Sequence, residues 1–365
     1  MTDTSISSKG FQDHHCHIGR AYTFHPEFFA HEGDINAFGD VPLKRKQSVT
    51  GVIHRGVAYQ DEKSLRGRTV RVIEEKVAAG ETLINAITDC TTDINSREFD
   101  LLLELREEYK EKININVGAY PLFGFKERDS DREKLIWKLA EKAQFLVGLP
   151  ERDDQPDHPI GFDGHIATLI KMATKFEIPL QVHVDQTNTP GEDGTERLIN
   201  AVHWLSTAAL PPHERPEVWA VHVISPSAYP EERFARMVQG LQDNNIGVIV
   251  CPWAALSMRQ MRNTASPTHN SMARVRELLK AGIRVRFGTD NINDLFMPGP
   301  MSALLMREWD ALQSSERWYD NGVLAKLFRG EDLNQSDLVG IDRSLTGDYE
   351  AFGWLQMSLN HNNGH

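Results

Sequence analysis

Two histidines near the N-terminus have a spacing that could bind a metal ion. His15 and His17 lie in Asp-His-His-Cys-His-Ile-Gly, residues 13–19, after a short apolar start. On a β-strand, residues i and i+2 point to the same face, so both imidazoles would meet while Cys16 turns away. Two such imidazoles are half of a mononuclear zinc or iron site. The alternative is a solvated histidine-rich loop or a purification tag.

Three later residues could supply the missing ligands. His183 and His222 lie in apolar, strand-like runs, and Asp290 follows Gly-Thr at the end of another. Each residue alone is weak evidence for a metal site, because a strand histidine is usually a core residue and such an aspartate is often a turn or cap residue. Together with the histidine pair they favour a metal site. There, a cation would lower the pKa of its water, Asp290 could take the proton, and His222 could polarise the scissile group.

These residues need a scaffold that gathers distant parts of the chain. Short β-branched runs alternate with amphipathic helical patterns, which predicts βαβ units and a parallel sheet. Eight such repeats favour a closed (β/α)8 TIM barrel of the α/β class, in which active-site residues lie at the C-terminal ends of strands. The competing fold is an open doubly wound sheet, but no Gly-x-Gly-x-x-Gly follows any expected strand. The expected strands are residues 10–18, 83–88, 113–119, 145–149, 180–184, 218–223, 247–251 and 283–288.

The length of 365 residues is one that α/β barrels reach as a single domain. We therefore expect one domain over residues 1–365, with the barrel at about 10–312 and a helical extension at about 313–365. The long stretch 20–60 shows no obvious structure, and we expect it to cover the mouth of the barrel.

Composition narrows the partners and the compartment. The net charge of −12, without a basic cluster, argues against nucleic acid, and no apolar run approaches the ~20 residues of a membrane span. The three cysteines are far apart and the N-terminus lacks an apolar signal core, so a reducing cytoplasm is expected. The expected partner is a small-molecule substrate, and a homo-oligomer is left open.

The ligand pattern resembles that of the amidohydrolase superfamily, in particular its cytosine-deaminase-like enzymes. Ala119-Tyr-Pro-Leu-Phe-Gly is similar to the segment after strand three of these enzymes, and residues 244–262 and 273–294 are similar to their strands seven and eight. The likeness spans about residues 10–312. It implies one catalytic divalent transition metal, with zinc as first choice and iron or manganese as alternatives. The implied ligands are His15, His17, His183 and Asp290, with His222 touching the metal or its water.

The sequence departs from the deaminases at the residues that read the substrate. They carry His-x-x-Glu after strand five, whereas Gln186 stands here and cannot titrate. Either Asp290 makes both proton transfers, or Asp185 swings in, or the substrate needs no such acid. Leu122 stands where the family's pyrimidine-reading glutamine is expected, and Asn291 replaces a second aspartate. Both changes argue against cytosine and favour a more apolar or differently shaped substrate.

Two further departures concern the scaffold. Too few residues precede His15 for the N-terminal strands of the β-sandwich that superfamily members usually carry, so we expect a barrel without it and with extra C-terminal helices. No lysine ends the fourth strand to bridge two metals, which favours one metal, although Glu151 could act as a bridge in another register.

The leading hypothesis is a metal-dependent amidohydrolase. It would hydrolyse a non-peptide C–N bond of a small cyclic amide or heterocycle by attack of metal-activated water, with Asp290 as base. The alternatives are a cytosine-deaminase-like deaminase of an aminated heterocycle and a non-catalytic metal-binding scaffold. The expected catalytic residues are Asp290, His222 and Gln186, and the expected substrate contacts are Gln186, Leu122, Phe123, Trp253, Arg259, Asn291 and Phe296.

Overall fold

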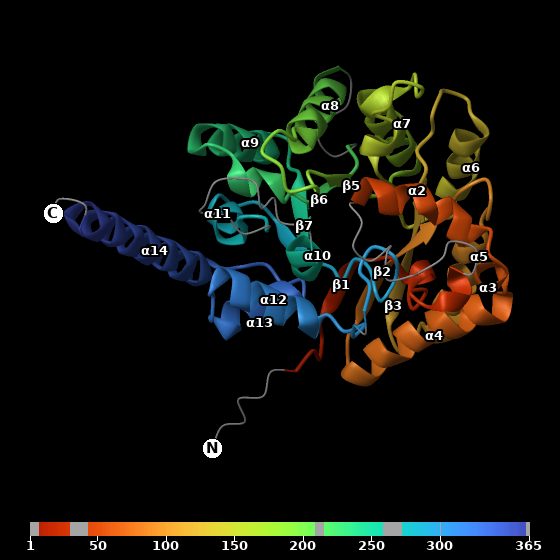
Figure 1. Ribbon diagram of the computed structural model, residues 1–365, viewed down its shortest axis with the longest axis horizontal. Coiled ribbons are helices and arrows are strands. Elements are labelled where there is room, and N and C mark those ends of the chain that lie inside the picture. Colours follow the sequence, from red (N-terminus) through yellow and green to blue (C-terminus); the bar gives the residue numbers. More distant parts are fainter. Residues whose placement is uncertain (1–6, 30–42, 209–214, 258–271, 300, 363–365) are drawn as a thin grey trace.

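The fold, seen in a computed structural model, is an eight-stranded parallel barrel (Figure 1). The structure describes residues 7–29, 43–208, 215–257, 272–299 and 301–362. The strands follow one another in chain order around the sheet, and a bridge between Cys16 and Asp290 joins the last strand end to the first. The predicted TIM barrel is thereby confirmed. Its strands are β1 (Gln12–Cys16), β2 (Leu83–Asp89), β3 (Asn114–Tyr120), β4 (Phe145–Gly148), β5 (Leu180–Val184), β6 (Val218–His222), β7 (Gly247–Val250) and β8 (Val285–Phe287).

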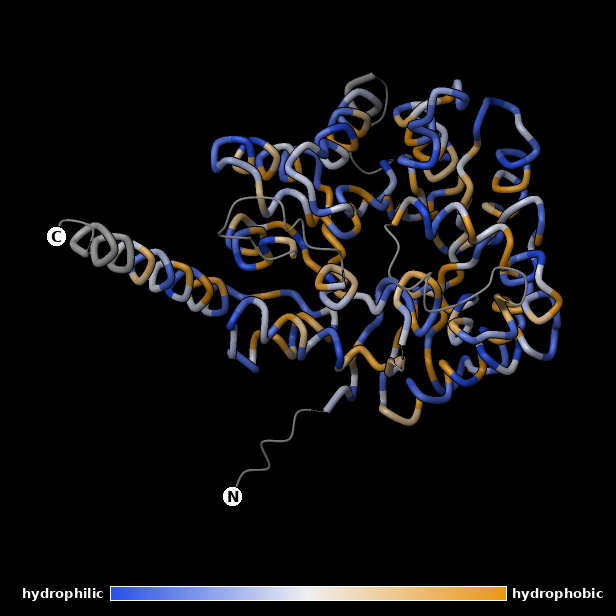
Figure 2. Tube along the Cα trace, viewed as in Figure 1, coloured by the Kyte–Doolittle hydropathy of each residue, from blue (hydrophilic) through white to orange (hydrophobic). Residues whose placement is uncertain are grey.

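Helices follow the strands and shield the barrel from solvent. The strands β4 and β7 are continuous apolar runs, because the strands of a parallel barrel are covered on both sides. Figure 2 shows the hydrophobic residues concentrated along the barrel and on the inner sides of the helices. The helices between strands are α4 (Glu62–Ala79), α5 (Arg97–Tyr109), α6 (Asp131–Ala140), α7 (Gly161–Phe176), α8 (Gly194–Ala208), α9 (Glu231–Asp243), α10 (Pro252–Ser257) and α11 (Val275–Lys280). None of the described helices combines the length and the apolar character that a bilayer crossing requires.

The junction of β1 and β8 depends on buried polar contacts. The Asp13 carboxylate accepts hydrogen bonds from the Thr289 hydroxyl (2.6 Å) and from the ammonium of Lys76 in α4 (2.8 Å). Gly288 lies so close to β1 that a Cβ atom there would be 2.5 Å from the Cβ of His15. The backbone N–H of Asp290 donates to the His15 carbonyl at 2.8 Å. These contacts fix the position of His15 along β1 relative to Asp290.

The stretch after β1 is more regular than the sequence suggested. Residues 43–54 form helix α2 (Leu43–His54), and α3 (Val57–Gln60) follows it directly. The expectation of an unstructured stretch is therefore wrong for this part. Residues 30–42 lie outside the described part of the chain. The 12-residue helix α2 is mostly polar, which is why its sequence shows little helical periodicity.

Three helices follow the barrel. Phe328 of α13 (Asn321–Phe328) stacks on Phe287 of β8 with ring centroids 4.4 Å apart. Trp309 of α12 (Met306–Glu316) stacks on Phe11 below β1. Helix α14 (Gln335–Asn362) extends away from the barrel (Figure 1). All strands in the described ranges belong to the barrel sheet, so a β-sandwich is absent from this part, as predicted.

Candidate active site

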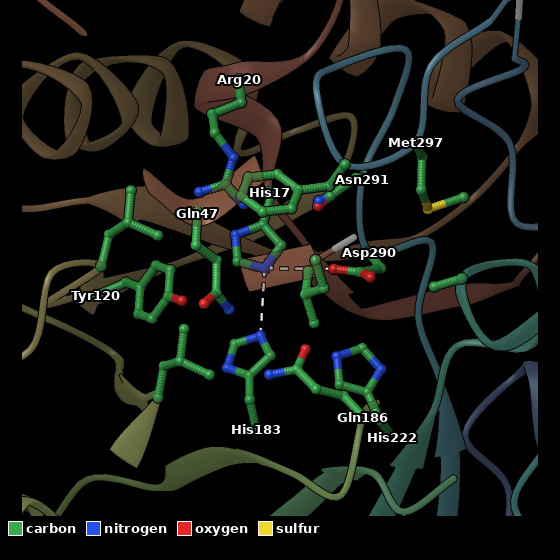
Figure 3. Close-up of a pocket in the computed structure, with 15 residues that line it drawn as sticks. His17, Arg20, Gln47, Tyr120, His183, Gln186, His222, Asp290, Asn291 and Met297 are labelled. Carbon is green, nitrogen blue, oxygen red and sulfur yellow. Dashed lines mark hydrogen bonds and ion pairs between the residues drawn. The ribbon is translucent and has the colours of Figure 1, made fainter. Parts of the chain in front are cut away.

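The predicted ligands converge at the C-terminal ends of β1, β5, β6 and β8. Figure 3 shows His17, His183, His222 and Asp290 around one space. The strand β1 ends at Cys16, so His17 lies in the turn that follows, yet its ring centroid is only 5.1 Å from that of His15. We call the five residues of this group the histidine cluster: His15, His17, His183, His222 and Asp290.

Distances within the histidine cluster match those of a metal site. His183 Nε2 lies 3.1 Å from His15 Nε2 and 3.3 Å from His17 Nε2. His17 Nε2 is also 3.3 Å from the nearer Asp290 oxygen. Potential ligand atoms of His15, His183, His222 and Asp290 all lie within 4.8 Å of one another. Nitrogen and carboxylate ligands of this kind suit a divalent transition metal.

The tautomers of two histidines supply a direct test of this fit. His15 Nδ1 donates to the Gln181 side-chain oxygen at 2.7 Å, and His183 Nδ1 donates to the Gly148 carbonyl at 2.9 Å. In the neutral form, a ring that carries its proton on Nδ1 has a bare lone pair on Nε2. The two Nε2 lone pairs therefore face each other at 3.1 Å, an arrangement that repels unless a cation lies between them. Amide and carbonyl oxygens, such as those of Gln181 and Gly148 here, are acceptors that orient the imidazoles of metal sites.

Burial keeps these imidazoles neutral. It lowers the pKa of His15 to about 4 and that of His222 to about 3. The pKa values of His17 and His183 also lie well below the ordinary value, first because of burial and then because of neighbouring positive groups. Neutral imidazole is the form that binds a metal ion. Burial raises the pKa of Asp290 to about 7, and Asp294 adds to this effect.

The backbone at the strand ends is unusual. His222 and Asp290 have positive φ angles of 78° and 55°, and Asp185 has 54°. Residues other than glycine rarely adopt this region, and each instance costs about 1–3 kcal/mol. Such strain collects at functional sites, where the surrounding fold holds a side chain in a required direction.

A cavity lies next to the histidine cluster and includes several predicted substrate contacts. Gln186, Leu122, Asn291 and Phe296 line it, as expected. Sequence reasoning missed other lining residues, because they gave no motif: Leu43 and Gln47 from α2, together with Tyr120, Leu149 and Ala254.

Two other predicted contacts, Phe123 and Trp253, do not line this cavity. Phe123 packs against the ring of His54, with centroids 5.6 Å apart, and is not among the described residues that line the cavity. Trp253 is 41% exposed, and its neighbour Ala254 lines the cavity instead. Arg259 lies outside the described residues.

Gln186 is oriented by a carboxylate that the sequence did not connect with it. Its Nε2 donates to Glu151 at 2.8 Å, and Glu151 lies just after β4. The amide oxygen of Gln186 is therefore the atom left for the cavity side (Figure 3). The suggestion that Asp185 swings in is disfavoured, because its two oxygens accept the backbone N–H groups of Gly194 (2.7 Å) and Thr195 (2.9 Å) at the start of α8.

A second group of charges lies beside the histidine cluster. We call it the arginine network: Arg20, His54, Asp89, Asp93 and Asp294. Arg20 donates to both oxygens of Asp89 at 2.7 and 2.8 Å and lies 3.4 Å from Asp294. Arg20 also lines the cavity, but it is already paired with two buried carboxylates.

Comparisons with known proteins bear on this arrangement. No family model matches the chain. It is 24% identical over 281 residues to an uncharacterised protein from Haemophilus influenzae, covering 76% of this chain and 94% of that one. It is 22% identical over 346 residues to N-isopropylammelide isopropyl amidohydrolase from a Pseudomonas species, covering 93% and 76%.

A solved structure has the same fold. The chain superposes on 5-methylcytosine deaminase from Klebsiella pneumoniae, liganded with 5-fluorocytosine, with a TM-score of 0.72 at 20% identity. The match covers 90% of this chain and 76% of the deaminase. The chain therefore has the same fold as this deaminase, and the resemblance that its sequence indicated is confirmed at the level of the fold.

Proposed function

We propose that the chain is a metal-dependent hydrolase that cleaves a carbon–nitrogen bond, other than a peptide bond, in a small cyclic amide or heterocycle. The observation that carries the proposal is the pair of unprotonated Nε2 atoms of His15 and His183, which face each other beside Asp290 at the cavity. The names of the relatives, an amidohydrolase and a deaminase, support the same class of reaction.

Each member of the histidine cluster has a role in this proposal. His15, His17, His183 and Asp290 hold the cation in this proposal. His222, whose potential ligand atom lies within 4.8 Å of those of His15, His183 and Asp290, contacts the cation or polarises the scissile group. A divalent cation held there supplies a water of lowered pKa, which is the nucleophile of hydrolysis. Asp290 is the carboxylate of the cluster that can accept the proton of this water and return it to the leaving nitrogen.

Gln186 contributes to binding, since an amide cannot deliver a proton. Glu151 accepts from the Gln186 Nε2 and so directs the amide oxygen towards the cavity. That oxygen can accept a hydrogen bond from an N–H or amine group of the substrate. Phe296, Leu122 and Asn291 form the adjoining wall and contact the ring.

Zinc is the proposed ion, with iron or manganese as alternatives, because neutral imidazoles and one carboxylate suit all three. We also propose a cytoplasmic location. Cys16, Cys90 and Cys251 are buried and unpaired, which agrees with a reducing compartment.

The experiment that tests the function is a screen of the metal-loaded protein. Hydantoin and dihydrouracil represent cyclic amides, while cytosine, pterin and N-isopropylammelide carry exocyclic amines. Ring opening and amine release are read separately. We expect turnover of at least one compound, and its loss in Asp290→Asn. A metal-loaded protein without turnover on related compounds of either class would favour the non-catalytic scaffold.

Deamination is the second candidate, and Gln186 separates it from ring opening. In Gln186→Glu, the introduced carboxylate would lie next to Glu151, and like charges raise the pKa of such a pair, which produces a proton donor. If the enzyme releases an amine, we expect this variant to release it faster by up to ~10²-fold. A ring-opening enzyme would gain nothing from the change.

A further inference from the structure

Helix α2 contributes polar chemistry to the cavity from outside the barrel. Leu43 and Gln47 are one helical turn apart and so lie on the same face of α2. Both line the cavity that His17 and His183 also line. The helix therefore covers the cavity with one apolar side chain and one carboxamide.

The Gln47 carboxamide has no hydrogen-bond partner among the described residues, although its side chain is largely buried. The residue is only 8% exposed. Figure 3 shows its amide directed into the space between His17, Tyr120 and His183. An amide that faces a cavity and has no protein partner there can bind a ligand or ordered water.

Contacts at both sides of Gln47 hold α2 in position. Lys46 Nζ donates to the Phe296 carbonyl, in the loop after β8, at 3.1 Å. At the end of the helix, His54 Nε2 lies 3.2 Å from Asp89 at the end of β2. The amide is thus presented from an anchored element, as a specificity group needs to be.

The walls around this amide are mainly apolar. Leu122 is 2% exposed and presents no polar group at the end of the segment after β3. Leu149 and Met297 line the same cavity. Arg20 is neutralised by Asp89 and Asp294, so it offers little net charge to a ligand. The lining suits a neutral, flat ring.

We propose that Gln47 is a specificity residue that binds a neutral heterocycle through an adjacent ring N–H and C=O. A carboxamide has one acceptor oxygen and two N–H donors, so it pairs with such an edge by two parallel hydrogen bonds. This inference deepens the proposed function, on which it rests: it assigns the substrate to rings that carry an –NH–C(=O)– edge. The polar group that would recognise this edge is the Gln47 carboxamide on α2, the helix that follows β1.

Binding to the metal-loaded full chain tests this assignment without requiring turnover. The probes are uracil, hydantoin and cyanuric acid, each beside its fully N-methylated counterpart, and calorimetry gives the dissociation constants. The variants are Gln47→Leu and Gln47→Glu, with Ser48→Ala on the same helix as the matched control, since Ser48 is exposed. Circular dichroism checks that each variant folds.

We expect at least one unmethylated ring to bind, and N-methylation to weaken its binding by about 10- to 100-fold. Gln47→Leu should lose a similar factor and become insensitive to methylation, while Gln47→Glu, which keeps the size but not the donor, should lose at least ~5-fold. Ser48→Ala should bind as the wild type does.

Several results would overturn the proposal. They are no binding by any unmethylated probe, equal binding of methylated and unmethylated rings, and unchanged binding in folded Gln47→Leu. The proposed function fails separately, by absent turnover of the metal-loaded protein, because that outcome leaves the pairing seen in the binding assay unchanged.

Discussion

The histidine cluster and the arginine network lie side by side and both contain buried histidine and aspartate, yet their histidines have opposite protonation states. In the cluster, burial lowers the pKa of His15 and His222, so the imidazoles are neutral. In the network, burial also opposes protonation of His54, but its hydrogen bond to Asp89 and its ion pair with Asp93 outweigh this effect and raise its pKa to about 9.

The difference lies in where the positive charge comes from. The arginine network contains its own cations, Arg20 and protonated His54, which balance the buried aspartates. The histidine cluster has facing lone pairs and one carboxylate, and a bound cation would complete it. A buried group of histidines and aspartates is therefore a candidate metal site only when the chain supplies no internal cation to it.

The largest expected effect comes from the carboxylate of the histidine cluster. Asp290→Asn should lower kcat/KM by about 10²–10⁴-fold, because the amide cannot accept a proton. The matched change in the arginine network, Asp93→Asn, should leave kcat/KM within about 10-fold, since Asp93 contacts His54 and not the cavity. Steady-state kinetics on the substrate found in the screen measures both. Equal losses of kcat/KM in the two variants would contradict the different roles assigned to the histidine cluster and the arginine network.

Removing the internal cation tests the network itself. Arg20→Met leaves Asp89 and Asp294 buried without their main partner and should lower the free energy of unfolding by about 3–5 kcal/mol. Arg45→Met, at an exposed position of α2, should change it by less than about 0.5 kcal/mol. Urea unfolding followed by circular dichroism compares them. An unaffected Arg20→Met would show that the network is not held by its arginine.

The raised pKa of His54 predicts a pH dependence of stability. Its folded pKa of about 9 exceeds the ordinary 6.5, so its contribution is fully present below about pH 6.5 and is lost as pH rises through 9. Between pH 6.5 and 9.5 the wild type should lose about 2–3 kcal/mol more than His54→Gln does. Urea unfolding at both pH values measures this difference. Parallel profiles for the two proteins would contradict a charged His54.

The smallest expected effect concerns the carboxylate that orients Gln186. In Glu151→Gln, the bond from Gln186 Nε2 loses its charged acceptor, which weakens it by about 1 kcal/mol. We expect kcat/KM to fall by about 3- to 10-fold while metal content stays unchanged. A loss of metal would instead place Glu151 among the ligands, as in a two-metal site.

Much of the fold followed from the sequence because buried parallel strands leave a strong pattern. The run at 180–184 was predicted as a strand and is β5 (Leu180–Val184). Element ends are less predictable, since β8 (Val285–Phe287) is shorter than the predicted run at 283–288. Helix α2 was missed because its polar face leaves little periodicity and tertiary anchors hold it.

The histidine cluster was predictable because strand ends of a barrel meet at one mouth, whatever their separation in sequence. Pairings between other loops follow no such rule. The sequence contains no signal that joins Glu151 to Gln186 or Arg20 to Asp89, and Asp185 looks like a candidate acid until its contacts with the start of α8 are seen. Gln47 could have been noticed only after α2 was placed over the cavity.

Metal content tests the central claim most directly. Elemental analysis by mass spectrometry of the purified wild type and of His183→Ala, with Asp93→Asn as the matched control, gives the number of transition-metal ions per chain. We predict about one ion in the wild type and in Asp93→Asn, and a loss of most of it in His183→Ala. A wild-type chain that retains no transition metal, even after incubation with zinc, iron or manganese, would contradict the account.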